Sequence, residues 1–171
     1  MFEEGCGLRV RKGNISDFSK LKWAWTKDFP TLEVFKDRIA NGKQELWVVD
    51  LEDFQGRLVG EFHIVWDSPD PDEADEKNRA YLCAFRIHPD YRGQGYGKAL
   101  LEGVLDRVRE QGIREVTIGV KENRPDIREL YYKWGFDELI KTKKDDHHNF
   151  NINGEPNTTE VPIELYLKEF G

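Results

Sequence analysis

The sequence contains little cysteine: Cys6 and Cys83 are the only two in 171 residues. Neither has a second ligand-type residue at a metal-binding spacing, and two cysteines cannot build a disulfide framework. A chain of this length can bury a core without such staples. We therefore expect one domain over residues 1–171 with no bound metal, and Cys83, which lies in an apolar run, is expected to be a small core residue.

Long apolar runs and an excess of positive charge are also missing. No apolar stretch reaches the roughly 18 residues that a membrane-spanning helix needs, and the N-terminus lacks the basic-then-apolar order of a signal peptide. The formal net charge is −7, so a polyanion such as nucleic acid would be repelled overall. We expect a cytoplasmic protein that binds neither membrane nor nucleic acid, and the acidic excess favours a cationic partner.

Apolar periodicity predicts a mixture of strands and helices, and no internal repeat or Pro/Ser-rich linker divides the chain. Asn14 or Ser16 can cap a first helix, whose apolar positions would be Phe18, Leu21, Trp23 and Trp25. The other elements expected in the first half are a strand at Leu8–Arg11, a helix at Thr31–Ala40, and a hairpin of Glu45–Leu51 with Leu58–Trp66.

The second half opens with an acidic segment, residues 67–79, which has no apolar face and is expected to be a solvated loop. Ala80–His88 is almost continuously apolar, which is typical of a central strand. An apolar stripe predicts a helix at Gly95–Gln111. The remaining expected elements are a strand at Glu115–Val120, a helix from Pro125 that Gly135 ends, strands at Phe136–Thr142 and Val161–Leu167, and a polar loop at Lys143–Glu160.

The clearest functional motif is the glycine-rich turn Arg92-Gly93-Gln94-Gly95-Tyr96-Gly97, which lies between the central strand and the long helix. The first N–H groups of a helix have no acceptor within the helix, and the helix dipole favours anions there. Glycines let these groups approach a phosphate closely, and Arg92 adds a positive charge. The turn therefore predicts an anion-binding site.

Two common phosphate-binding motifs do not fit this turn. A dinucleotide-binding loop has the spacing G-x-G-x-x-G with an acid about 20 residues further on, whereas this turn reads G-x-G-x-G. A Walker loop needs Ser or Thr after its lysine, whereas Lys98 is followed by Ala99. An ordinary strand–helix turn without a ligand stays open on these observations.

Two motifs resemble those of the GNAT superfamily of N-acetyltransferases. The segment Ile87-x-Pro89-x-Tyr91-Arg92-Gly93-x-Gly95-x-Gly97 is similar to its acetyl-CoA signature, whose core [QR]-x-x-G-x-[GA] is matched by Arg92, Gly95 and Gly97. About 40 residues on, Tyr131-Tyr132-Lys133-Trp134-Gly135-Phe136, with Asn123 before it, is similar to a second family block. The resemblance follows the whole chain in element order and is strongest from Ala80 to Phe136.

The resemblance implies a GNAT-like α/β (α+β) fold, with a mixed, mostly antiparallel sheet of about seven strands, splayed central strands and about four helices. The order of elements agrees with a mixed α/β fold and with a right-handed parallel crossover from Ala80 to Val120.

The resemblance also implies that acetyl-CoA is the co-substrate. The backbone near Ile87 would bond the pantetheine arm, and the amides of the glycine-rich turn would hold the pyrophosphate. The implied cofactor-binding residues are Ile87, Arg92, Gly93, Gln94, Gly95, Tyr96, Gly97, Lys98 and Asn123. Asn123 precedes Tyr131 by eight residues where the family has about seven, so the helix entry is expected to carry one extra residue.

The implied reaction is direct acetyl transfer to a primary amine in a ternary complex. By resemblance Tyr131 is the acid that protonates the CoA thiolate, and Tyr132 takes that role if the helix is rotated. Glu61 and His63 alternate on one face of their strand and are the candidate general bases, because an ammonium must lose a proton before it attacks. All four residues have an alternative interpretation as packing or surface residues. His147 and His148 lack a third metal ligand, so no metal is expected.

By resemblance, acceptor selection falls to the first two helices and the loop before the last strand, with the acidic segment 67–76 a further candidate. The candidate acceptor groups are Trp23, Trp25, Phe29 and residues 67–76 and 143–160. Aromatic and acidic groups would suit a cationic small-molecule or peptide amine, such as a polyamine, an aminoglycoside-like amine, a protein N-terminus or a lysine. Dimers are common in the family, so the resemblance also allows a homodimer. The alternative functions are a non-catalytic acyl-CoA sensor of the same fold and a nucleotide-binding protein.

Overall fold

The computed structural model describes residues 8–26 and 29–170. The interpretation of Cys6 and of the N-terminal residues lies outside this range, and so does the side chain of Phe29. The described chain forms two compact units. Unit 1 contains the described residues up to Ile64 together with Ala84–Arg107, and unit 2 contains Val65–Cys83 together with the described residues from Val108 onward.

Seven strands of the described chain form a sheet with the order β1-β2-β3-β4-β5-β7-β6. Arg79–Leu82 of β4 pair in parallel with Glu115–Ile118 of β5, whereas β1–β2, β5–β7 and β6–β7 pair antiparallel. This confirms the predicted mixed, mostly antiparallel fold. The strands are β1 (Arg9–Lys12), β2 (Gln44–Asp50), β3 (Leu58–Val65), β4 (Arg79–Ile87), β5 (Glu115–Lys121), β6 (Glu138–Phe150) and β7 (Pro156–Glu169).

In residues 8–26 and 29–170, three α-helices and two short 3₁₀ helices accompany the sheet: η1 (Ile15–Lys20), α1 (Phe29–Ala40), η2 (Pro89–Tyr91), α2 (Tyr96–Glu110) and α3 (Pro125–Lys133). The predicted first helix is limited to η1, because Ile, Ser and Asp are weak helix formers and the Leu21 N–H closes the last turn on the Phe18 carbonyl at 3.0 Å. Trp23 and Trp25 therefore follow the helix. Among the described helices, none is long and apolar enough to cross a membrane.

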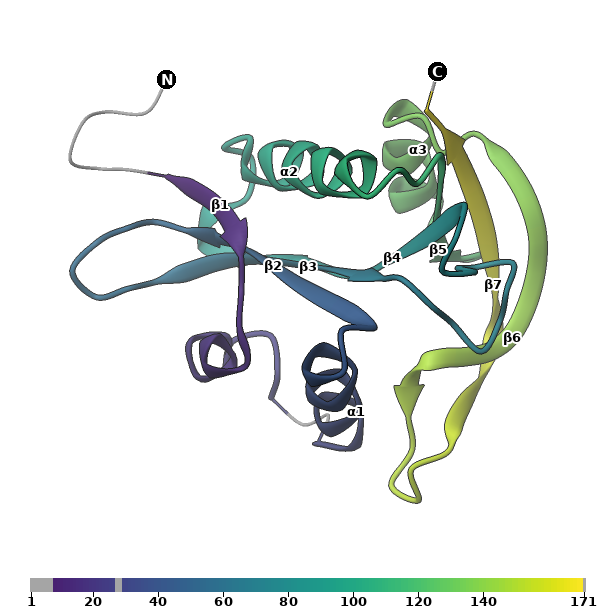
Figure 1. Ribbon diagram of the computed structural model, residues 1–171, viewed down its shortest axis with the longest axis horizontal. Helices are drawn as coiled ribbons and strands as arrows, with labels where there is room; N and C mark the ends of the chain where they lie inside the picture. The colour runs from purple at the N-terminus through teal and green to yellow at the C-terminus, as the bar shows by residue number, and fades with distance from the viewer. Residues whose placement is uncertain (1–7, 27–28, 171) are drawn as a thin grey trace. The chain divides into compact units, whose positions relative to one another are not determined.

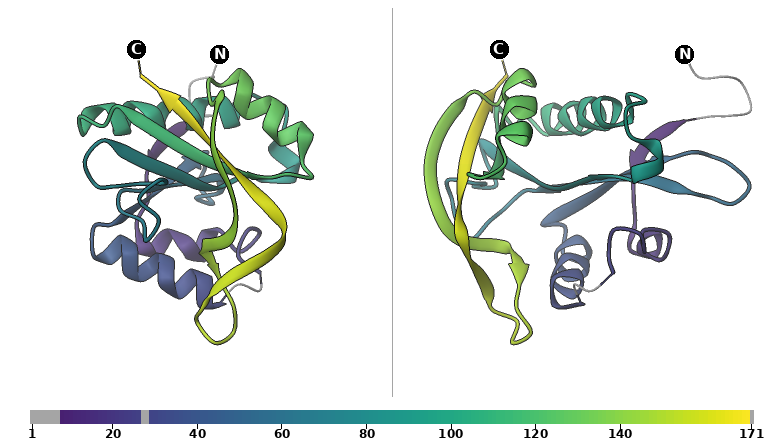
Figure 2. Two further views of the ribbon diagram at one scale, coloured as in Figure 1. Left: turned by 90° about the vertical axis from the view of Figure 1, so that its right-hand side faces the viewer. Right: turned by 180° about the vertical axis from the view of Figure 1, so that it is seen from behind.

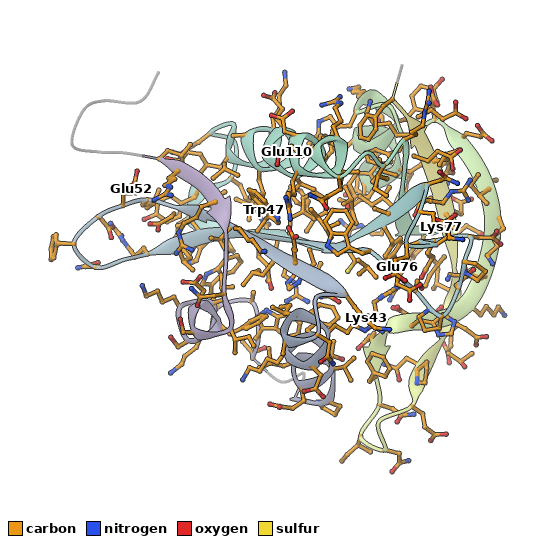
Figure 3. The ribbon with its side chains drawn as sticks, in the orientation of Figure 1. Lys43, Trp47, Glu52, Glu76, Lys77 and Glu110 are labelled. Carbon is orange, nitrogen blue, oxygen red and sulfur yellow. The ribbon has the colours of Figure 1, made fainter. Side chains whose placement is uncertain are left out.

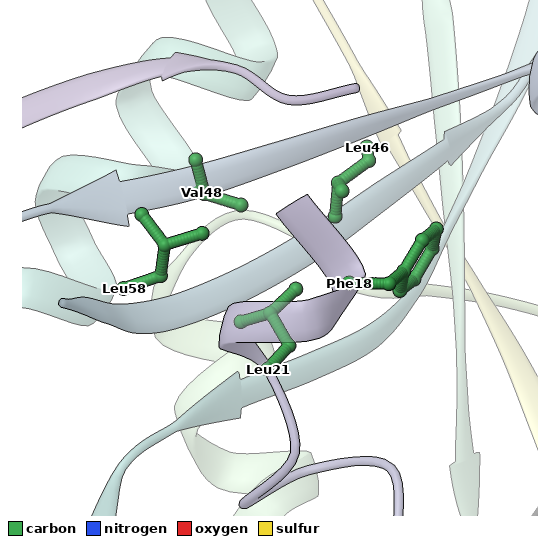
Figure 4. Packing of buried hydrophobic residues seen from close by; sticks show 5 residues of the cluster. All are labelled: Phe18, Leu21, Leu46, Val48 and Leu58. Atoms are coloured by element: carbon green, nitrogen blue, oxygen red, sulfur yellow. The ribbon is translucent and has the colours of Figure 1, made fainter. Parts of the chain in front are cut away.

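In unit 1, α2 lies on one face of β1, β2 and β3, and η1 and α1 lie on the other (Figure 1). On the side of the sheet that η1 covers, a cluster of buried side chains packs η1 against β2 and β3: Phe18, Leu21, Leu46, Val48 and Leu58 (Figure 4). On the α2 side, Trp47 (labelled in Figure 3) donates to Glu45, whose carboxylate also accepts from Arg107 of α2 at 2.8 Å. Alternate residues of β2 thus serve opposite layers.

In unit 2, β6 and β7 form a long curved hairpin (Figure 2). The predicted polar loop Lys143–Glu160 was wrong, because β6 continues to Phe150 and β7 begins at Pro156. The backbone pairing extends through polar residues, with Asp145 opposite Thr158 and Asp146 opposite Asn157. Strand hydrogen bonds come from the main chain, so a two-sided polar strand pairs without an apolar alternation.

The acidic segment at residues 67–79 is a loop, as predicted, but it is not solvated throughout. Ser68, Asp70 and Glu73 are buried, and Glu73 is 1% exposed. The interpretation as a solvated loop failed because the residues that neutralise these carboxylates lie about 70 positions later, on β6.

Candidate active site

The glycine-rich turn lies at the end of β4 in unit 1 and leads into α2. Gly93 and Gly95 have φ of +76° and +83°, and a Cβ added at either would meet no atom within 4 Å. Positive φ favours glycine at both positions. The open space above them, with exposed Arg92, Gln94 and Lys98 alongside, is what a phosphate needs to reach the backbone.

The first turn of α2 offers unpaired amide groups. Its hydrogen-bond ladder begins with the Ala99 N–H donating to the Gly95 carbonyl at 3.1 Å, so the N–H groups of Tyr96, Gly97 and Lys98 precede the first helical donor and have no acceptor within the helix. Gly97 has a different task, since a Cβ there would lie 2.9 Å from the ring of Phe85. This glycine lets the helix start pack closely on β4.

A chain of hydrogen bonds supports the turn from the β2–β3 hairpin. Arg57 donates from Nη1 to the Tyr91 hydroxyl at 2.9 Å and from Nε to Asp53 at 2.6 Å. At the end of β4, Arg92 donates from Nε to the carbonyl of Ile87 at 3.2 Å. Arg57 was not identified from the sequence, because nothing near a hairpin turn signals a partner 34 positions away.

Glu61 and His63 lie side by side on one face of β3, as their alternation predicted. His63 Nε2 lies 2.7 Å from Glu61 Oε2, and His63 Nδ1 lies 2.9 Å from the Gln44 amide nitrogen. With the amide nitrogen of Gln44 donating to Nδ1, the Nε2–H of His63 donates to Glu61. Both side chains are fully buried. An amine would therefore contact Glu61 or His63 only if neighbouring side chains moved or relayed the proton.

The carboxylate of Glu61 also accepts a hydrogen bond from Trp25 and pairs with Arg86. Trp25 Nε1 donates to Oε2 at 2.7 Å, and Arg86 Nη1 lies 3.5 Å from Oε1. The Arg86 guanidinium is 4.5 Å from the Trp25 ring centroid and bonds the Ala24 carbonyl at 3.1 Å. Arg86 was missed, although a charged residue inside the apolar run of a central strand was a usable signal.

Tyr131 lies on α3 in unit 2 and is 8% exposed, whereas Tyr132 is 62% exposed. Burial raises the pKa of Tyr131 to about 12, against an opposing effect of the nearby Arg124 charge. The hydroxyl therefore stays protonated at neutral pH. Asn123 is exposed just before the helix. Tyr131, Tyr132 and Asn123 thus belong to unit 2, and the other predicted catalytic and cofactor-binding residues belong to unit 1.

Unit 2 also contains a buried polar network around Glu73. Its carboxylate accepts from Ser68 at 2.7 Å and Lys143 at 2.6 Å, and lies 2.7 Å from His148 Nε2. Burial alone raises the pKa of Glu73, but the bonds and charges of His148 and Lys143 outweigh it and hold the pKa near 2. The network ties the acidic loop to β6, and the ring of Tyr81 stacks on His148 at 4.5 Å.

Comparison with known proteins identifies the family of the chain. The acetyltransferase (GNAT) family model matches residues 13–136. The uncharacterized N-acetyltransferase YycN of Bacillus subtilis is 28% identical over 118 residues, which are 66% of this chain and 71% of that protein. The spermine/spermidine N(1)-acetyltransferase of Bacillus subtilis is 30% identical over 84 residues, 48% of this chain, and the match spans only 55% of that enzyme.

Solved structures show the same fold. Arabidopsis thaliana NAA60 in complex with acetyl-CoA aligns with a TM-score of 0.69 at 19% identity, covering 96% of this chain and 99% of that one. The family match gives the class of the protein, which is an acetyltransferase. Because the family match covers more than half of its residues, the chain belongs to the acetyltransferase (GNAT) family.

Proposed function

We propose that the protein is an acetyl-CoA-dependent N-acetyltransferase that moves the acetyl group directly to a primary amine. The observation that supports this best is the start of α2, where Gly93 and Gly95 leave open space in front of amide N–H groups that have no acceptor within the helix. Such a helix start suits the pyrophosphate of the donor. The family to which the chain belongs supplies the reaction class.

The proposed chemistry moves two protons: the base takes one from the amine, and the acid gives one to the CoA thiolate. The amine nitrogen attacks the thioester carbon, the C–S bond breaks, and the thiolate leaves as CoA. Tyr131 is the proposed acid that gives the thiolate its proton, which its raised pKa of about 12 keeps available. Glu61 is the proposed base, because within the described residues its Oε1 has only Arg86 as a polar partner, at 3.5 Å, while Oε2 is bonded by Trp25 and His63. His63 would then stabilise the negative charge of Glu61 by a hydrogen bond.

A second candidate function is a non-catalytic acyl-CoA sensor. The observation that favours it is the complete burial of Glu61 and His63 with their hydrogen bonds satisfied. A thiol-release assay with acetyl-CoA and a panel of primary amines separates the two. The enzyme releases CoA in step with amine acetylation, whereas a sensor is stabilised by acetyl-CoA without thiol release. The homodimeric state and the cytoplasmic location of the protein remain predictions from the sequence.

A further inference from the structure

Unit 1 has an open pocket of about 580 Å³ between η1, the segment after it and α1. Its apolar lining includes Phe18, Trp25 and Leu32, and its basic lining comprises Lys22 and Lys36. No Asp or Glu occurs among its described lining residues. The pocket therefore combines an apolar floor with two positive charges.

Both lysines are available to a ligand. Lys22 is exposed and makes no ion pair within the described part of the chain. Lys36 lies 3.8 Å from Glu33, whose side chain is 68% exposed, and such a surface pair is weak and easily exchanged. The buried acid of η1, Asp17, is engaged by Arg11 at 3.0 Å. An anion on the ligand would thus meet two cations without displacing a strong pair.

The pocket is connected to the proposed base by one residue. Trp25 lines the pocket, and its Nε1 donates to Glu61 at 2.7 Å. The Trp25 ring already carries the Arg86 guanidinium at 4.5 Å from its centroid. That covered ring does not favour a second cation, because two like charges near one ring repel each other.

Three carboxylates of the acidic loop are already held by lysines of β6. Asp70 accepts from Lys141 and Lys143, Asp72 accepts from Lys141, and Glu73 accepts from Lys143. These carboxylates are neutralised within unit 2 and are not free to recruit a cationic amine.

We infer that the acceptor is a primary amine with an apolar body and a carboxylate, an amino-acid-like amine whose carboxylate lies between Lys22 and Lys36. This inference rests on the proposed transferase function and departs from the expectation of a cationic acceptor. A polyamine would place extra positive charge beside both lysines, which Coulomb repulsion disfavours.

The test uses two acceptors of nearly the same shape, para-(aminomethyl)benzoate with a carboxylate and para-(aminomethyl)benzamide with a neutral amide in its place, with a linear diamine as the cationic alternative. Their aminomethyl groups have similar basicity, so differences in kcat/KM report recognition rather than amine protonation. We expect the benzoate to be favoured about tenfold, since two exposed charge pairs contribute to its binding. Preference for the benzamide or the diamine would overturn the inference.

Variants locate the effect. The double variant Lys22→Ala/Lys36→Ala is expected to remove the preference while leaving kcat/KM for the benzamide within about twofold. Lys20→Ala is the matched control, because Lys20 is an exposed lysine of η1 outside the pocket lining. A preference that survives in the double variant, or that Lys20→Ala removes, would overturn the assignment to this pocket.

Binding measured without turnover separates this inference from the proposed function. Calorimetry compares para-(acetamidomethyl)benzoate with the corresponding benzamide on the wild-type chain and the double variant. Tighter binding of the benzoate, lost in the double variant, supports the pocket even if no thiol is released. Equal binding of the two probes to the wild-type chain contradicts the inferred carboxylate site, whatever the thiol-release assay shows.

Discussion

Replacing Glu73 by Gln tests the buried network that holds the acidic loop on β6. Glutamine keeps the size of the side chain but removes the charge that faces Lys143 at 2.6 Å and His148 at 2.7 Å. The change leaves Lys143, whose side chain is 12% exposed, with Asp70 as its remaining carboxylate. We therefore expect a folded but less stable protein.

The magnitude follows from the pKa of Glu73, which falls from 4.5 to about 2 on folding. A difference of this size corresponds to about 3 kcal/mol of folding free energy, with each pKa unit worth about 1.4 kcal/mol. Because the folded pKa is the lower one, the contribution is fully present above pH 4.5. It is lost progressively as the pH falls from 4.5 towards 2.

The assay is urea unfolding, followed by circular dichroism, at several pH values from 7 down to about 3.5. At pH 7 Glu73→Gln should lower the free energy of unfolding by about 3 kcal/mol, and the gap to wild type should shrink below pH 4.5. Asp126→Asn is the control, since Asp126 also has a pKa near 2 but pairs with Arg124 on the surface. A gap that is absent at pH 7, or constant down to pH 3.5, would refute the role given to the network.

Two substitutions test the proposed acid and base. Tyr131→Phe should lower kcat about 100-fold while acetyl-CoA binding stays within about twofold, and Tyr132→Phe should change neither; equal losses in both variants would reassign the acid. Glu61→Gln should lower kcat by a similar factor without loss of acetyl-CoA binding. Glu45→Gln, a matched buried carboxylate held by Arg107, should keep kcat, and an unchanged kcat in folded Glu61→Gln would place the base elsewhere.

Local patterns predicted the elements that carry a strong apolar period. The stripe of α2 is an example: the helix was predicted at Gly95–Gln111 and runs from Tyr96 to Glu110, with Leu100, Val104 and Val108 fully buried. The β6–β7 hairpin was underestimated for the opposite reason. Its outer part is held by backbone pairing between polar residues such as Asp145 and Thr158, which leaves no apolar period to detect.

The candidate site was predictable where one segment carries the chemistry. The turn from Arg92 to Gly97 has its glycines, its arginine and its helix start within a few positions. The environment of Glu61 was not predictable, because Trp25 and Arg86 come from segments 36 and 25 positions away. Long-range polar contacts follow from the tertiary fold and leave no mark in local sequence.

The central claim is that the turn before α2 binds the acetyl-CoA pyrophosphate, and a thermal-shift measurement tests it most directly. Acetyl-CoA should raise the Tm of the wild-type protein, whereas ATP and NAD should not. Gly95→Leu should abolish the acetyl-CoA shift in a folded protein. Gly112→Leu is its matched control, since both glycines have positive φ and open space around them, and this variant should keep the shift. An acetyl-CoA shift that survives in Gly95→Leu, or a wild-type shift with ATP or NAD but not with acetyl-CoA, would contradict the account.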